Sequence, residues 1–173
     1  RQKFIAGGLP ANKITTKPNF LVSDPGAKQD EGSYALFLGR LSNEKGIDCL
    51  INAWSNGYDL PLKIAGDGPL REQLSESINK RDFRHISLEG FLSSSLAIEL
   101  IKKSRFMIFP SLWYEGFPLV IVEAFACGVP VIASCLGAVT EIMKDGKTGL
   151  LFNPGDAQDL ATKIIWALNH PEE

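Results

Sequence analysis

The chain has 173 residues, of which 45% are hydrophobic and 22% are charged, and its formal net charge is −2. This length is typical of one domain with its own core, and no apolar stretch approaches the roughly 20 residues of a membrane span. The slightly acidic balance argues against a nucleic-acid-binding surface. Three cysteines without Cys-x-x-Cys spacing indicate reduced thiols and a cytoplasmic protein.

Residues 1–33 differ in composition from the rest of the chain. They contain three prolines, the pair Gly7-Gly8 and a polar stretch at 23–32. The β-branched run at 14–17 is expected to add a strand, and the remainder to form a lead-in or linker. Because the first residue is Arg rather than Met, we expect a piece of a longer chain.

From residue 34 onward, short runs rich in Val, Ile, Leu and Phe alternate with longer segments of helical spacing. Such runs are typical of strands that are buried on both faces of a sheet. Strand and helix units in succession imply right-handed crossovers and a parallel sheet. We therefore predict an α/β, doubly wound, Rossmann-like fold with helices on both faces. The predicted strands are 34–38, 62–65, 86–88, 106–109, 131–133 and 150–152.

Helix signals agree with this alternation. Apolar residues recur at helical spacing over 47–54. Pro69 stands where the first turn of a helix accepts proline. Asp156, followed by Asp159, resembles a capping box that opens the last helix, predicted over 160–169.

Chemically distinctive residues directly follow the predicted strands, where an open parallel sheet binds its ligands. Gly39 and Arg40 leave the first strand, and Lys45 stands at the start of the next helix. Two cations beside a helix N-terminus favour a diphosphate. On spacing alone, a solvated surface with Lys45 paired to Glu44 is an equally good interpretation.

A second candidate lies at 115–123. Gly116 and Pro118 suit a turn into a helix whose free N–H groups would face an anion. Glu123 is the only charged residue within 116–140. An unpaired carboxylate among apolar neighbours costs several kcal/mol, so Glu123 must face a partner or an opening. Hydroxyl groups of a sugar or ribose would satisfy it, and a buried salt bridge to a distant Arg or Lys is the alternative.

Other motifs fail on inspection. The segment 66–71 begins like a dinucleotide fingerprint but ends in arginine where the third glycine is needed. Residues 146–148 resemble the end of a phosphate loop, yet Glu141 stands in place of its first glycine. The chain has no Asp-x-Asp pair and no His or Cys cluster, so we predict no metal site. Trp113 and Tyr114 are interpreted as a packed loop wall.

Together, these segments resemble the C-terminal half of the retaining glycosyltransferases of family 4, which have the GT-B fold. Each stretch is a weak signal, but all of them in this order are specific. Glu115 and Glu123 match the paired-glutamate motif of that family. The likeness covers about residues 35–170, and its matching segments are 39–46, 64–69, 110–118 and 123–134.

The resemblance implies that 34–173 is a nucleotide-sugar-binding domain, and that 1–33 is the exit from a missing N-terminal acceptor domain. It implies a retaining, metal-independent enzyme without a separate cofactor. The parent would transfer a hexosyl-type group from a nucleotide-diphosphate-sugar to a glycan or lipid, as in polysaccharide biosynthesis. The fragment alone is expected to be inactive, and membrane association of the parent is an expectation that rests on the family only.

The resemblance also implies roles for single residues. Arg40 and Lys45 would stabilise the diphosphate leaving group, and Glu115 would face the donor sugar, so these three are the expected catalytic residues. Glu123 would hold the ribose hydroxyls. Phe91 and Leu92 would line the pocket for the nucleotide base. The other residues expected at the donor site are Gly39, Gly116, Phe117, Pro118 and Leu119.

Two other functions stay open on the sequence. One is a nucleotide-sugar-binding module without catalysis. The other is half of a dinucleotide-dependent oxidoreductase, in which Glu89 would supply the acidic residue that closes a strand. The chain also departs from the family at 137–140, where two glycines and a proline are often found, so contacts from that loop are undecided.

Overall fold

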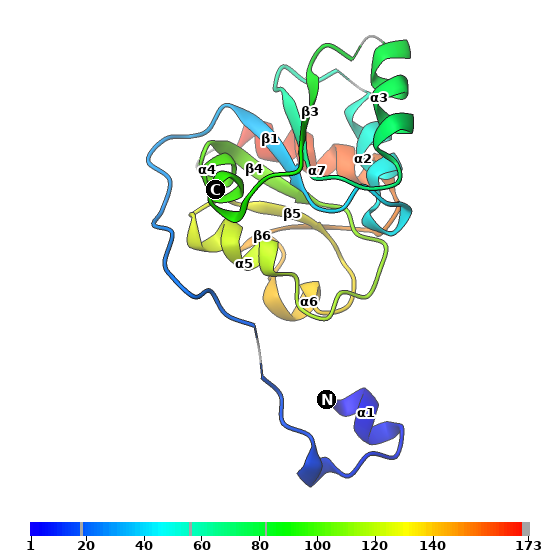
Figure 1. The fold of residues 1–173 in the computed structure, drawn as a ribbon, viewed down its shortest axis with the longest axis vertical. Coiled ribbons are helices and arrows are strands. Elements are labelled where there is room, and N and C mark those ends of the chain that lie inside the picture. Colours follow the sequence, from blue (N-terminus) through cyan, green and yellow to red (C-terminus); the bar gives the residue numbers. More distant parts are fainter. Residues whose placement is uncertain (18, 56, 82, 171–173) are drawn as a thin grey trace.

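The computed structural model describes residues 1–17, 19–55, 57–81 and 83–170. A six-stranded sheet forms its centre (Figure 1), in the order β3-β2-β1-β4-β5-β6 with every neighbouring pair parallel. This arrangement confirms the predicted doubly wound fold. The strands are β1 (Tyr34–Leu38), β2 (Leu62–Ala65), β3 (Ile86–Gly90), β4 (Ser104–Phe109), β5 (Val131–Ser134) and β6 (Gly149–Phe152).

Helices cover both faces of the sheet. Figure 1 shows α2, α3 and α7 on one side and α4, α5 and α6 on the other. Their bounds are α2 (Ile47–Trp54), α3 (Arg71–Lys80), α4 (Ser94–Lys102), α5 (Leu119–Ala126), α6 (Val139–Ile142) and α7 (Ala157–Asn169). Among the described residues, no helix is long and apolar enough to cross a membrane.

Two apolar clusters hold these layers together. Phe37 of β1 packs in the cluster with α2 and α7, whereas its neighbour Leu36 packs in the cluster with α5. Both side chains are buried, because successive residues of a strand point to opposite faces. Burial of each side chain of this size stabilises the fold by roughly 1.5–3 kcal/mol. Strands that are buried on both faces are therefore rich in consecutive apolar residues.

Asp156 caps the last helix as predicted, but the helix begins at Ala157 rather than at 160, and only half of the capping box forms. The Asp156 carboxylate accepts hydrogen bonds from the N–H groups of Gln158 and Asp159, each at 3.0 Å. The Asp159 carboxylate does not return to Asp156. It accepts from the N–H of Asn153 at 2.8 Å, and so ties the helix to the end of β6.

Pro69 does not lie in a first helical turn, contrary to the prediction, since α3 begins at Arg71. The preceding loop is held by the loop after β1 instead. Leu41 donates its N–H to the carbonyl of Asp67 at 2.9 Å and accepts from the N–H of Leu70 at 3.0 Å. These bonds fix the loop after β2 against the loop after β1.

The strand predicted at 14–17 is not formed. The preceding segment contains the helix α1 (Gln2–Ala6) and the 3₁₀ turn η1 (Ala11–Lys13), and the Arg1 guanidinium binds the carbonyl of Ile14 at 3.3 Å. Figure 1 shows this segment away from the sheet, so a β-branched run there has no strand to pair with. Nearer the domain, the Lys28 ammonium donates to the Ser104 carbonyl at 3.2 Å.

Candidate functional site

A pocket of about 580 Å³ opens at the carboxyl edge of the sheet. It lies beside β1 and β4, the adjacent strands at which the chain order reverses, and this is where α/β sheets bind ligands. Most of the expected site residues meet there, and Gly116 does not line it. Those that line it are Gly39, Arg40, Lys45, Phe91, Leu92, Glu115, Phe117, Pro118, Leu119 and Glu123.

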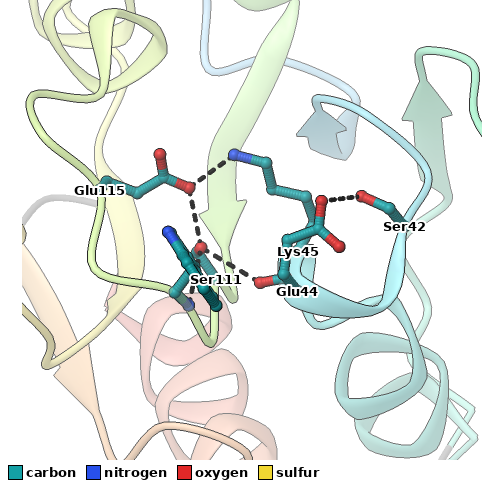
Figure 2. A network of polar contacts seen from close by, with 6 residues as sticks. Ser42, Glu44, Lys45, Ser111 and Glu115 are labelled. Carbon is teal, nitrogen blue, oxygen red and sulfur yellow. Dashed lines mark hydrogen bonds and ion pairs between the residues drawn. The ribbon is translucent and has the colours of Figure 1, made fainter.

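An ion pair crosses this pocket between two loops that are distant in sequence (Figure 2). The Lys45 ammonium lies 2.5 Å from Oε1 of Glu115. The interpretation in which Lys45 pairs with Glu44 is therefore wrong. The Glu44 carboxylate accepts from the Ser42 hydroxyl at 2.6 Å, and this hydrogen bond lowers the pKa of Glu44.

Backbone contacts hold the two loops in register. Lys45 ends the 3₁₀ turn η2 (Asn43–Lys45), and Gly46 caps α2. The Glu44 carbonyl accepts the N–H of Leu112 at 2.8 Å. A Cβ on Gly46 would lie 2.0 Å from the carbonyl oxygen of Pro110, so only glycine allows this approach. The Lys45 and Glu115 side chains thus start from a fixed backbone.

Arg40 supplies the second cation. It is exposed at the end of β1, and within the described ranges its guanidinium has neither a hydrogen bond nor an ion pair with the protein. Gly66 brings the loop after β2 close by, because a Cβ there would lie 1.8 Å from the carbonyl oxygen of Gly39. The pocket therefore holds one paired cation, Lys45, and one that is open to an anion.

Glu123 reaches the same pocket from α5. Its carboxylate has no ion pair or hydrogen bond with any residue that the structure describes, so the salt-bridge alternative is not realised there. Partial burial raises the pKa of Glu123. A half-buried acceptor facing a cavity suits a ligand that carries hydrogen-bond donors.

The amino end of α5 also faces this cavity. Pro118 is the N-cap residue rather than the first helical residue, and the N–H groups of Leu119 and Val120 open the helix, where no intrahelical acceptor exists. Leu119, Val120 and Pro118 all line the pocket. A helix of eight residues adds modest positive potential at this point.

The aromatic residues of the loop do not behave as expected. Trp113 and Tyr114 are 65% and 63% exposed and do not line the pocket, so they do not form a packed wall. The contacts of Ser111 and Glu115 with η2 turn the intervening side chains outward. Instead, the Lys3 ammonium lies over the Tyr114 ring, 4.9 Å from the ring centre.

Ser111 is a site residue that the sequence analysis did not single out. Its hydroxyl donates to Oε1 of Glu115 at 2.9 Å (Figure 2), and the residue is only 2% exposed. The available signal was a small polar residue two positions after a buried strand, at the edge where the other site residues gather. Gly66 and Asp67 also line the pocket.

Comparison with known proteins identifies the family. The model of the glycosyl transferases group 1 matches residues 22–173. The chain belongs to this family. An uncharacterized glycosyltransferase of Methanocaldococcus jannaschii is 37% identical over 145 residues, which are 83% of this chain and 41% of the relative. The alpha-D-kanosaminyltransferase of Streptomyces kanamyceticus is 30% identical over 148 residues, 83% of this chain and 38% of the relative. The chain thus spans about two fifths of these relatives.

Solved structures agree with the sequence relatives. The Anabaena protein HepE, in complex with UDP and glucose, matches with a TM-score of 0.72 at 28% identity, over 80% of this chain and 39% of that protein. TarM of S. aureus matches in fold, with a TM-score of 0.83 at 23% identity over 96% of this chain and 35% of that one. This group 1 glycosyltransferase domain therefore has the Rossmann-like architecture of half a GT-B fold.

Proposed function

We propose that this domain binds the nucleotide-diphosphate-sugar donor of a retaining, metal-independent glycosyltransferase of family 4. The parent transfers a hexosyl-type group to a glycan or lipid acceptor that a separate N-terminal domain of the same protein holds. One observation carries the proposal: Arg40 and Lys45 from the loop after β1, Glu115 from the loop after β4 and Glu123 from α5 line a single pocket at the sheet's carboxyl edge.

The diphosphate binds at the cations. Arg40 has no protein partner within the described residues, and it lines the same pocket as Lys45 and the residues that open α5. Charge-assisted hydrogen bonds from these groups strengthen as negative charge grows on the departing diphosphate. Arg40 and Lys45 therefore act as leaving-group stabilisers.

The nucleoside binds in the same pocket, with its ribose at Glu123 and its base at Phe91. Glu123, an acceptor without a protein partner among the described residues, takes the ribose hydroxyls. The exposed Phe91, with Leu92, lies after β3 and borders the base. The UDP held by the Anabaena relative supports a nucleoside diphosphate as the ligand class.

Glu115 orients the sugar. Its carboxylate lines the pocket next to Lys45, where it accepts hydrogen bonds from sugar hydroxyls and steadies positive character near the anomeric carbon. In a front-face reaction the acceptor attacks on the side from which the diphosphate leaves, and the enzyme needs no nucleophile of its own. This is the retaining course that the proposal assigns to the parent enzyme.

Calorimetry on this chain tests donor binding. UDP, GDP and ADP are titrated, together with their common sugar conjugates, into the wild-type protein and into Arg40→Ala. We expect binding of at least one nucleoside diphosphate and a loss of about 10-fold or more in Arg40→Ala. Lys147→Ala removes a charge from the exposed loop before β6 and should bind normally. Absence of binding to the whole panel would overturn the proposal.

A further inference from the structure

Two donors share one oxygen of Glu115. Oε1 accepts from the Lys45 ammonium at 2.5 Å and from the Ser111 hydroxyl at 2.9 Å (Figure 2). The three residues come from the loops after β1 and β4, and all of them line the pocket. The carboxylate is therefore held by one donor from each loop before any ligand arrives.

The two bonds differ in how easily they break. The Lys45 and Glu115 side chains are 24% and 19% exposed, so water competes for both groups and weakens the ion pair. Ser111 is 2% exposed, so its hydroxyl is shielded from water. An incoming anion can therefore break the ion pair between Lys45 and Glu115 more readily than water can break the hydrogen bond between Ser111 and Glu115.

We infer that Lys45 changes partners when the diphosphate binds, leaving Glu115 for the phosphate oxygens. Ser111 is then the positioning residue that keeps the carboxylate in place. This inference rests on the proposed function. Lys45 has one ion pair in each state. The phosphate, which carries more negative charge than a carboxylate, replaces Glu115 as the partner of the ammonium.

The exchange makes sugar recognition conditional on the diphosphate. While Lys45 occupies Oε1, the carboxylate is neutralised and is a poorer acceptor for sugar hydroxyls. Once the ammonium moves, the charge and the lone pairs of Glu115 become available to the sugar. Free sugars, which cannot draw Lys45 away, are consequently discriminated against at this position.

Ser111 is suited to this role by its own contacts. Its oxygen accepts the N–H of Trp113 at 3.4 Å and lies 3.3 Å from the Glu44 carbonyl. The hydroxyl has one hydrogen, and the shorter contact, to Glu115, takes it. The serine oxygen is thus fixed by the N–H of Trp113 in its own loop, and it can hold Glu115 without help from Lys45.

Inorganic pyrophosphate tests the exchange, because it carries the anion without base or sugar. Glu115→Gln removes the competitor for Lys45, and its affinity for pyrophosphate should rise about tenfold over wild type. Glu123→Gln removes the same charge from the same pocket without touching Lys45, so its gain should stay near about twofold. Equal gains in the two variants, or none in Glu115→Gln, would overturn the exchange.

The role of Ser111 is tested with nucleoside diphosphates and their sugar conjugates: UDP against UDP-glucose, and GDP against GDP-mannose. In Ser111→Ala, the affinity for the plain diphosphate should be unchanged, and the additional affinity provided by the sugar should fall at least about threefold. Ser111→Thr keeps the hydroxyl and should restore it. A merely structural serine would instead weaken both ligands of a pair together, and that result refutes the positioning role.

The two proposals fail in different ways. If the wild-type protein binds nucleoside diphosphates but Glu115→Gln shows no gain for pyrophosphate, the exchange is wrong and donor binding stands. If pyrophosphate binding responds as expected but no nucleotide binds, the exchange stands and the donor assignment is wrong. If neither pyrophosphate nor any nucleotide binds, both are wrong.

Discussion

Gly46 and Pro110 approach each other so closely that a Cβ on the glycine would lie 2.0 Å from the proline carbonyl oxygen. This contact joins the loop after β1 to the loop after β4. It brings Lys45, the residue before Gly46, within reach of Glu115. The ion pair at the pocket therefore depends on a residue that has no side chain.

Gly46→Ala should lower the free energy of unfolding by about 2–4 kcal/mol, measured by urea denaturation. The substitution adds the strain of a positive φ of 70° to a steric overlap with backbone. Gly146→Ala is the matched control, with a φ of 69° and no atom within 4 Å of the added Cβ. It should cost only about 1–2 kcal/mol. Equal losses would mean that the contact with Pro110 is not constraining.

Asp156→Ala should destabilise the protein by about 1 kcal/mol in the same assay. The carboxylate caps α7 through the N–H groups of Gln158 and Asp159, and a cap of this kind typically contributes that amount. Gln158→Ala keeps the backbone donor and changes only an exposed side chain of the first turn, so it should remain within about 0.5 kcal/mol of wild type. A larger loss in Gln158→Ala than in Asp156→Ala contradicts the assignment.

Glu123 should make stability fall with rising pH. Burial raises its pKa above the ordinary 4.5, so the folded state binds its proton more tightly than the unfolded state does. Below pH 4.5 the group contributes nothing. As the pH rises through the folded-state pKa, ionisation destabilises the fold.

Replacement of Glu123 by Gln removes this dependence. Urea denaturation at about pH 3.5 and at about pH 7.5 should show the stability of Glu123→Gln rising relative to wild type between the two values. Other titrating groups cancel in this comparison because both proteins contain them. A stability difference that stays constant with pH would show that the environment of Glu123 does not penalise its charge.

Substitutions of Arg40 and Glu123 should affect the binding of different parts of a nucleotide, the diphosphate and the ribose. Arg40→Ala should weaken both pyrophosphate and UDP by about 1.5–3 kcal/mol, through loss of a charge-assisted hydrogen bond. Glu123→Ala should weaken UDP and leave the affinity for pyrophosphate within about twofold of wild type, because only UDP has ribose hydroxyls. Calorimetry measures both. An equal loss for pyrophosphate in Glu123→Ala would show that Glu123 does not face the ribose.

The fold was predictable because the pattern that indicates each strand lies within a few consecutive residues. Strands buried on both faces are mostly apolar, as β1 and residues 106–109 of β4 are, so each run marked a strand without knowledge of its neighbours. Parallel connections then require the carboxyl ends to share one edge. The meeting of Arg40 and Glu123 in one pocket followed from this topology rather than from any detail of side-chain contact.

Contacts between distant loops were not predictable in the same way. On the sequence, Glu44 was as good a partner for Lys45 as any other carboxylate. Lys45 pairs instead with Glu115, 70 residues away, because backbone packing brings the two loops together. Similarly, residues 14–17 have the composition of a strand, but pairing requires an open edge next to them. The outward orientation of Trp113 also depends on how the loop is anchored at its two ends.

The separation of Lys45 and Glu115 along the chain has a practical consequence. A polypeptide cut between α4 and β4 would leave the ammonium on one piece and the carboxylate on the other. Neither piece alone would hold both walls of the cavity, and anion affinity would return only as the pieces reassociate. Titration with pyrophosphate would then report how completely the severed sheet has been rebuilt.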